Sequence, residues 1–320
     1  MKNVAVIGLG NIANRHRRNL RMLFPEAKIF AISSSGRKVD EVIPDCDEVV
    51  TNIDQLIPLL DMAVVASPAP FHAQHALPFI KAGIPVLIEK PIAASLTDVK
   101  KLEEACKAYQ TPVAVGYCLR YMPSAQILLR ELEQKIIGKI LNARVSIGQY
   151  LPDWRSTKNY KDSVSANKAL GGGALLELSH ELDYTRWLLG NLQIQHAIVR
   201  NSGTLDIDVE DLVDVVATTD ENAVVHIHLD LLQRKAYRTC DFVGTHGRLE
   251  WNLINNELLL HNASGTEIIY QVENYDRNEM YLDMLTDFLR LISGDANNCI
   301  RLDDAAATIT LIEHIKEFAN

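Results

Sequence analysis

The chain has 320 residues, of which 48% are hydrophobic and 23% are charged, and its formal net charge is −9. This length predicts two domains with cores of ordinary size. The excess of 41 acidic over 32 basic residues removes the basic surface that nucleic acids require, so no nucleic acid or other polyanionic partner is expected.

The five cysteines are widely spaced and never form a Cys-x-x-Cys pair. This spacing argues against a disulfide framework and against a zinc site, so no metal is expected. Reduced thiols indicate a cytoplasmic protein. The sequence has no apolar run of membrane-spanning length, and its first residues lead directly into the fold. Neither a membrane anchor nor a cleavable signal is therefore expected.

The first predicted strand, residues 4–7, runs directly into a glycine turn and then a helix. Gly8 permits the turn, Gly10 lets a pyrophosphate approach the backbone, and Ala13 is small enough for the helix to pack on the strand. The free N–H groups at the helix start face the anion. This order predicts dinucleotide binding, and the alternative is a glycine turn without a ligand. The predicted cofactor-binding residues here are Gly8, Gly10, Asn11 and Ile12.

The second predicted strand, residues 28–32, ends in a serine-rich loop. NAD-specific sites usually place an acidic residue there, because a carboxylate binds the ribose hydroxyls and repels a 2′-phosphate. Ser33 and Ser34 supply hydroxyls in its place. Arg37 and Lys38 follow as cations, so the sequence predicts NADP(H) in preference to NAD(H). A solvated loop that accepts either cofactor, NAD included, is the alternative.

Helices and buried strands alternate after this loop, with helices expected over residues 53–60 and 71–82 and strands over 62–66 and 86–88. This alternation predicts an α/β fold with a doubly wound parallel sheet. Ligands of such sheets bind beyond the carboxyl ends of the strands. The residues at those ends that are predicted to bind the cofactor are Ser67, Pro68, His72, Glu89 and Lys90.

Lys90 is also the first candidate for catalysis. It lies at a strand end between Glu89 and Pro91, and the proline biases it toward an extended conformation. Partial burial beside an oxidised nicotinamide favours proton transfer by its ammonium group. The alternative is a surface lysine paired with Glu89.

In this order the motifs resemble the glucose-fructose oxidoreductase / inositol dehydrogenase (Gfo/Idh/MocA) family. The segments that carry the resemblance are residues 8–13, 67–72, 89–91, 115–121, 137–140, 171–183 and 187–190. The resemblance implies an N-terminal Rossmann domain over residues 1–120 that binds NAD(P). It also implies a C-terminal α/β domain over residues 121–320, with a large and mostly antiparallel sheet, for substrate binding and oligomerisation. A homodimer or homotetramer is expected on the same grounds.

The resemblance implies hydride exchange between a nicotinamide cofactor and a carbinol carbon, usually of a sugar or polyol. For this chain we expect the substrate to be a sugar, sugar acid or nucleotide-sugar derivative. The Lys of the family's Glu-Lys-Pro motif is the acid/base and corresponds to Lys90. The His of its helix after the glycine run is the other proton-transfer or substrate-orienting group and corresponds to His180. Glu177 takes the place of the family's Asp, three residues before the His instead of four, and both spacings keep the groups on one helical face. Residues 178–183 resemble a branch associated with surface-glycan sugars such as nonulosonic acids.

The second half carries the predicted substrate residues. A strand over 139–150 leads into a loop in which Trp154 can stack on a sugar ring, while Arg155 and Lys158 can pair with a carboxylate or phosphate. This loop favours an anionic carbohydrate, and a solvated loop without a ligand is the alternative. The full predicted substrate set is Tyr117, Arg120, Tyr150, Trp154, Arg155, Lys158 and Asp183.

A helix is expected over residues 174–189, with ionisable residues at every third position. A His between two acids can be held in one tautomer and can move a proton. Structural pairing is the alternative for Asp183. Alternating segments between residues 212 and 271 predict an antiparallel meander, and helices over 278–292 and 303–318 end the chain.

The sequence therefore predicts an NAD(P)-dependent sugar dehydrogenase or reductase that acts on a CH–OH group. Two alternatives come from relatives of the same fold. One is a redox-neutral glycosidase that holds NAD tightly, and the other is a non-catalytic regulator that senses the cofactor. The presence of Lys90 and His180 argues against the regulator.

Overall fold

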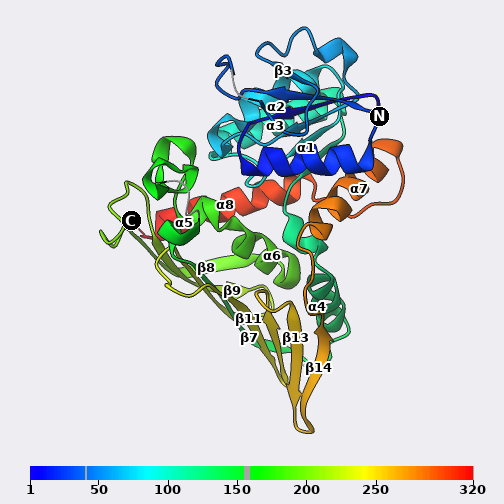
Figure 1. Cartoon of the computed structure of the whole chain (residues 1–320). Helices are drawn as coiled ribbons and strands as arrows, with labels where there is room; N and C mark the ends of the chain where they lie inside the picture. Colours follow the sequence, from blue (N-terminus) through cyan, green and yellow to red (C-terminus); the bar gives the residue numbers. More distant parts are fainter. Residues whose placement is uncertain (40–41, 155–158, 320) are drawn as a thin grey trace. The chain divides into compact units, whose positions relative to one another are not determined.

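The computed structural model describes residues 1–39, 42–154 and 159–319 and divides into two compact units (Figure 1). The first unit comprises Met1–Cys118 and Asn278–Ile309, and the second comprises Leu119–Arg277 and Thr310–Asn320.

The first unit is built on a parallel sheet with the strand order β3-β2-β1-β4-β5-β6. The described strands are β1 (Asn3–Ile7), β2 (Lys28–Ile32), β3 (Glu48–Val50), β4 (Met62–Val65), β5 (Val86–Ile88) and β6 (Val113–Val115). All four residues of β4 are buried, as expected for a central strand covered on both faces. The order reverses between β1 and β4, so the predicted doubly wound sheet is confirmed.

The helices of this unit are α1 (Asn11–Leu23), α2 (His72–Lys81), α3 (Leu96–Tyr109), α7 (Glu279–Ser293) and part of α8 (Leu302–Ala319). Helix α1 packs on β1 and β2, and α2 packs on β4 and β5. The helix expected over residues 53–60 is wrong, because only a single 3-10 turn, η1 (Ile57–Leu59), forms there. Pro58 lacks the N–H that a longer helix needs.

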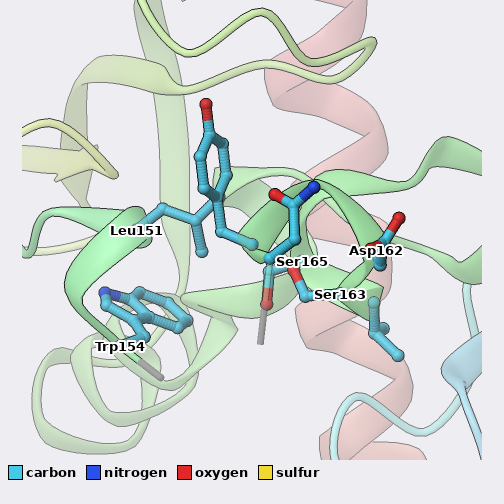
Figure 2. A pocket seen from close by; sticks show the side chains of 8 residues that line it. Leu151, Trp154, Asp162, Ser163 and Ser165 are labelled. Carbon is cyan, nitrogen blue, oxygen red and sulfur yellow. The ribbon is translucent and has the colours of Figure 1, made fainter. Parts of the chain in front are cut away.

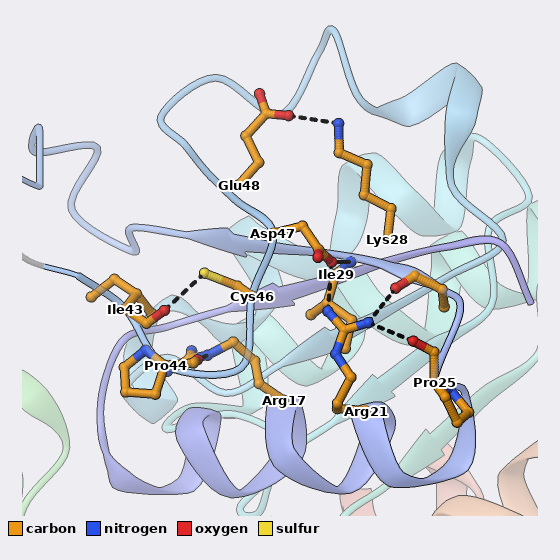
Figure 3. Close-up of polar contacts among 11 residues, drawn as sticks. Arg17, Arg21, Pro25, Lys28, Ile29, Ile43, Pro44, Cys46, Asp47 and Glu48 are labelled. Atoms are coloured by element: carbon orange, nitrogen blue, oxygen red, sulfur yellow. Dashed lines mark hydrogen bonds and ion pairs between the residues drawn. The ribbon is translucent and has the colours of Figure 1, made fainter.

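The C-terminal end of α1 is hydrogen-bonded to the region of β2 and β3 by a polar cluster (Figure 3). Arg21 donates to the carbonyls of Pro25 at 3.0 Å and Ala27 at 2.8 Å and to Asp47 Oδ2 at 2.6 Å. The backbone N–H of Ile29 donates to the same carboxylate at 2.7 Å. This N–H is the main favourable contact that holds the pKa of Asp47 below its usual range, with Arg21 adding to it. The cluster fixes the angle at which α1 leaves the sheet.

The second unit is built on a larger sheet with the order β14-β13-β12-β11-β7-β10-β9-β8. Its described strands are β7 (Ile140–Gly148), β8 (Leu192–Arg200), β9 (Leu212–Thr219), β10 (Val224–Asp230), β11 (Tyr237–Gly244), β12 (Arg248–Asn252), β13 (Glu257–Asn262) and β14 (Gly265–Gln271). Figure 1 shows these long strands side by side. The sheet is mostly antiparallel, which confirms the predicted fold class. The simple meander is wrong, because β7 lies between β10 and β11 and runs parallel to β10.

One face of this sheet carries the core. The residues of β10 alternate, with Val225, Ile227 and Leu229 buried, as a sheet with one covered face requires. The helices on that face are α4 (Pro123–Glu133), α5 (Ala174–Glu177) and α6 (Ser179–Leu189), which contact β13 and β14, β9 and β10, and β7 and β10, respectively. Trp251 Nε1 donates to Ser124 Oγ at 3.0 Å, so the largest buried side chain of the core keeps its hydrogen bond.

The other face of β10 holds a histidine between two acids. His228 Nε2 lies 2.9 Å from Asp230 Oδ2, and its Nδ1 lies 2.7 Å from Asp214 Oδ1. The bond to Asp230 is the largest favourable contribution, and together with Asp214 it raises the pKa of His228 to about 9. The folded state therefore binds this proton more tightly than the unfolded state does.

We expect His228 to make stability depend on pH. Because its folded pKa is raised, the stabilisation is fully present below about pH 6.5 and is lost as pH rises through about 9. His228→Gln should lower the free energy of unfolding near pH 6 by about 1–2 kcal/mol, after allowance for partial solvent screening, and should change little near pH 10. Urea titrations across this range measure the effect. His226→Gln, on the same strand face, is the control, and an equal pH dependence in both variants would contradict the assignment.

Candidate functional site

The glycine turn after β1 is shaped by close packing. Gly8 has φ +119°, and a Cβ atom there would lie 2.4 Å from the Ala66 carbonyl oxygen at the end of β4. The Gly8 N–H donates to the Ile32 carbonyl at 2.8 Å, so this turn joins the ends of β1, β2 and β4. Only glycine fits there.

The N-terminus of α1 opens onto free space. Gly10 is the N-cap residue and has no side chain to satisfy the first N–H groups of the helix. A Cβ atom on Gly10 would meet no described atom within 4 Å. Asn11 is exposed and Ile12 half-buried at this end. Unsatisfied N–H groups with room in front of them are what a phosphate group needs, so the residues present fit a dinucleotide.

The loop after β2 is compact. Ser33 is buried, its Oγ lies 3.3 Å from Ser35 Oγ, and its carbonyl accepts the Gly36 N–H at 3.1 Å. Ser34 is half-buried, whereas Arg37 and Lys38 are exposed. The loop therefore presents hydroxyls close to the sheet and cations further out.

Two histidines of α2 connect the loops that surround this region. His72 is buried, and its ring nitrogens lie 2.9 Å from the Pro91 carbonyl and 2.7 Å from the Ser67 carbonyl. His75 Nδ1 lies 2.9 Å from Ser67 Oγ, and the ring also bonds the Ser34 backbone. Burial, the largest cause, lowers the pKa of His75. His72 therefore links the loop that contains Ser67 and Pro68 to the turn at Pro91. The sequence reasoning did not identify His75.

Glu89 and Lys90 follow β5 and occupy different environments. Glu89 is buried and its Oε1 lies 2.6 Å from His16 Nε2, a residue of α1 that the sequence reasoning also missed. Lys90 is half-buried. Tyr117, which was predicted to bind substrate, is fully buried in the first unit.

In the second unit two predicted substrate residues bind each other. Arg120 Nε donates to Asp183 Oδ2 at 2.9 Å, and its Nη2 donates to Oδ1 at 2.6 Å. Both side chains are buried, and the guanidinium carbon lies 5.5 Å from the centre of the Trp187 ring. This bidentate pair joins η3 (Cys118–Tyr121) to α6.

The single helix expected over residues 174–189 is wrong. Helix α5 ends at Glu177, Leu178 has φ −97° and ψ 25°, and α6 begins at Ser179. Glu177 and His180 therefore lie on either side of a break, and the argument from one helical face does not apply to them. Both are half-buried, and Glu177 Oε2 accepts a hydrogen bond from Ser165 Oγ at 3.0 Å.

The glycine run shapes the start of α5. Gly173 has φ +105°, and a Cβ atom there would lie 2.4 Å from Glu210 Oε1. The same oxygen accepts the N–H of Leu175 at 3.0 Å, so Glu210 caps the start of α5 from another loop. Burial raises the pKa of Glu210.

The predicted substrate loop encloses a cavity of about 150 Å³ in the second unit (Figure 2). Leu151, Trp154 and Ser165 are among its lining residues, and Ser165 is the donor to Glu177. Tyr150 lies just before it and carries the Arg234 guanidinium 3.8 Å above its ring. Arg155 and Lys158 lie outside the described residues.

Within the described residues, no group of three or more His, Cys, Asp or Glu side chains is placed to hold a metal ion. No helix in the described part of the chain has the length and apolar character to cross a membrane.

Comparison with known proteins covers both halves of the chain. Residues 2–117 match the profile described as "Oxidoreductase family, NAD-binding Rossmann fold", and residues 126–250 match "GFO/IDH/MocA C-terminal domain". The inositol 2-dehydrogenase of Acidothermus cellulolyticus is 27% identical over 278 residues, which cover 82% of this chain and 76% of that protein. The levoglucosan dehydrogenase of Pseudarthrobacter phenanthrenivorans is 27% identical over 61% of this chain and 56% of its own.

Solved structures show the same fold. A levoglucosan dehydrogenase in complex with NADH and levoglucosan superposes with a TM-score of 0.85 at 20% identity, covering 99% of this chain and 96% of the other. The WlbA dehydrogenase of Bordetella pertussis, in complex with NADH and UDP-GlcNAcA, gives a TM-score of 0.82 at 17% identity, covering 100% and 97% of the two chains. With matches in both halves and the open helix start after Gly8, the chain belongs to the Gfo/Idh/MocA family of NAD-binding oxidoreductases.

Proposed function

We propose that this protein is a dehydrogenase or reductase that uses NADP(H), or NAD(H), on a CH–OH group of a sugar, polyol or sugar-acid derivative. The observation that carries the proposal is the glycine turn with its open helix start, at the same sheet edge as the Glu89-Lys90 turn. The relatives named above act on inositol and levoglucosan, and a further relative in Bacillus subtilis is a glucose-6-phosphate 3-dehydrogenase. These names favour a cyclic, hydroxyl-rich substrate.

The proposal divides the work between the two halves of the chain. Residues 1–120 hold the cofactor, with its phosphates at Gly8, Gly10, Asn11 and Ile12. Ser67 and Pro68, whose loop is held by His72, also bind the cofactor. Residues 121–320 bind the substrate, and its binding residues there are Tyr150, Trp154, Arg155, Lys158 and Asp183, joined by Tyr117 and Arg120 from just before the boundary. When bound, the nicotinamide accepts or supplies the hydride.

The chain's own residues handle the proton. In the proposal, Lys90 Nζ takes the hydroxyl proton when the alcohol is oxidised and returns it when the carbonyl is reduced. His180 orients the same hydroxyl and shares the proton transfer. Glu177, held by Ser165, orients His180 from across the break between α5 and α6. The bidentate bond between Arg120 and Asp183 fixes α6, and with it His180, in the second unit.

A substrate that carries a carboxylate or phosphate is favoured within this class. Arg155 and Lys158 follow Trp154 in the sequence, and cationic residues next to an aromatic residue in the chain suit an anionic sugar. The resemblance to a branch associated with surface-glycan sugars such as nonulosonic acids stays a prediction. A cytoplasmic homodimer or homotetramer is also part of the proposal.

A direct assay tests the activity. The purified chain is mixed with NADP+ or NAD+ and with myo-inositol, levoglucosan, glucose 6-phosphate or a UDP-linked uronic acid, and absorbance at the reduced-nicotinamide band is followed. We expect absorbance to rise with at least one of these substrates. Hydrolysis of a glycoside without net change in absorbance would instead support the redox-neutral glycosidase. Nucleotide binding without turnover of any substrate in either direction would support the regulator.

We expect the loop after β2 to set the choice of cofactor. Ser33→Asp places a carboxylate where the 2′-phosphate of NADP(H) would bind, so the ratio of kcat/KM for NADPH over that for NADH should fall by about 10-fold or more. Ser33→Ala removes the hydroxyl without adding charge and should change the ratio by less than about 3-fold. A wild-type enzyme that clearly prefers NADH would contradict the NADP(H) assignment but not the proposed reaction.

A further inference from the structure

His16 and Glu89 form a buried polar pair within the first unit that no part of the proposed reaction uses directly. His16 is fully buried on α1, and Glu89 is 5% exposed at the end of β5. Their side chains meet at 2.6 Å although 73 residues separate them in sequence. A carboxylate removed from water is costly unless it is paired and hydrogen-bonded, so this contact is what lets Glu89 stay inside.

The remaining surroundings of Glu89 leave its carboxylate little freedom. Its Oε2 accepts the backbone N–H of Lys90 at 3.2 Å, and its own N–H donates to the Val65 carbonyl at 2.8 Å. Gly116 on the neighbouring chain segment packs directly against it, because a Cβ atom there would lie 3.2 Å from Glu89 Cδ and Oε1. The Glu89 carboxylate thus contacts both His16 and the peptide that begins Lys90.

The imidazole of His16 is held in turn by α7. The Tyr281 ring meets it edge-on, with centroids 6.2 Å apart and planes at 77°. Arg15, the preceding residue of α1, places its guanidinium carbon 4.5 Å from the centre of the same ring. Burial, and then the proximity of Cys118 and Glu89, raise the pKa of Tyr281. Tyr281 is therefore neutral, and its ring packs against the imidazole of His16 and orients it.

Helix α1 consequently contacts both ends of the predicted cofactor site. Its first turn faces the predicted phosphate position, and His16 lies five residues further on, about 7 Å along the axis. We propose that His16 is a positioning residue, which holds Glu89 so that the adjacent Lys90 keeps one orientation for proton transfer. This inference rests on the proposed function of Lys90.

The Nδ1 atom of His16 is buried and has no hydrogen-bond partner among the described residues. If His16 served mainly for packing, a residue of similar volume could replace it without loss of kcat. A histidine retained for its Nε2 atom needs a replacement that keeps a donor or acceptor at that position. Glutamine does so, because its amide nitrogen reaches as far from the backbone as Nε2 does, and phenylalanine does not.

The experiment compares His16→Phe with His16→Gln. We expect His16→Phe to lower kcat by about 10-fold or more, with the dissociation constant of the reduced cofactor and the substrate KM changed by less than about 3-fold. His16→Gln should recover most of the lost kcat. The double variant His16→Phe with Glu89→Gln has no unpaired buried carboxylate, so it should fold. Its kcat should nevertheless stay low, because the His16 side chain that holds residue 89 is still missing.

A second readout does not need turnover. Amine-specific labelling of the nucleotide-free protein, followed by peptide mass spectrometry, gives the reaction rate of Lys90 relative to the exposed Lys81. The ratio should change several-fold in His16→Phe and remain close to wild type in His16→Gln. An unchanged ratio together with an unchanged kcat would overturn the positioning role. A changed ratio in a protein without oxidoreductase activity would support positioning and reject the proposed function. Equal losses in kcat and in cofactor affinity would also overturn the positioning role, because His16 would then serve nucleotide binding.

Discussion

Replacing Lys90 by Met is expected to lower kcat by about 10²–10⁴-fold, the usual contribution of a positioned general acid or base. Methionine matches the length of the lysine stem but carries no proton. The buried contact between Glu89 and His16 is untouched by this change, and the glycine turn at Gly8 is formed by other segments. Binding of the cofactor, followed by fluorescence of the reduced nicotinamide, should therefore weaken by less than about 3-fold.

Lys81→Met is the matched control, because Lys81 is an exposed lysine in the last turn of α2 in the same unit. Its kcat should equal that of the wild type. Turnover that survives in Lys90→Met would show that another group moves the proton, and His180 would then be the first candidate. Loss of nucleotide binding together with turnover would instead identify Lys90 as a cofactor anchor without a separate chemical role.

Much of the first unit could be predicted from sequence because its signals are local. The apolar run at residues 4–7 and the turn at Gly8 follow one another directly, and each glycine has a reason that can be stated from chemistry alone. The buried strands β4 and β5 read as continuous apolar segments, since parallel strands are covered on both faces. The alternation with helices predicts parallel strands joined by right-handed crossovers, whereas the strand order is known only from the structure.

The pairings inside the candidate site could not be predicted in the same way. His16 meets Glu89 across 73 residues, and Arg120 meets Asp183 across 63 residues. Periodicity identifies which face of a helix is buried, but a polar residue on that face gives no sign of its partner. His16 was passed over for this reason. Asp183 was predicted as a substrate ligand, with structural pairing as the alternative, and the structure shows its carboxylate bound to Arg120.

The break between α5 and α6 is a feature that local propensity does not predict. Residues 174–189 have the spacing of one helix, and nothing near Leu178 is a helix breaker. Glu210 approaches from another loop and fills the space beside Gly173, which fixes the entry angle of α5. The position of β7 between β10 and β11 likewise depends on long-range pairing that consecutive strand signals do not contain.

The largest expected effect on stability comes from Asp183. Asp183→Asn keeps the shape of the side chain but removes its charge, which leaves the Arg120 guanidinium 6% exposed and without its carboxylate. Removal of one partner from a buried ion pair costs about 3–5 kcal/mol, because the remaining charge is out of water and has lost the carboxylate to which it made its bidentate bond. Urea denaturation near neutral pH should show a loss of this size.

The control for Asp183→Asn is an ion pair of the same unit that lies in solvent. Asp206 pairs with Lys161 at the surface, so Asp206→Asn should leave the denaturation midpoint unchanged. A double variant, Arg120→Met with Asp183→Leu, replaces the buried pair by apolar side chains and should be more stable than Asp183→Asn alone. If Asp183→Asn were no less stable than Asp206→Asn, water would have to reach the guanidinium, and the pair would then be free to exchange Asp183 for an anionic group of the substrate.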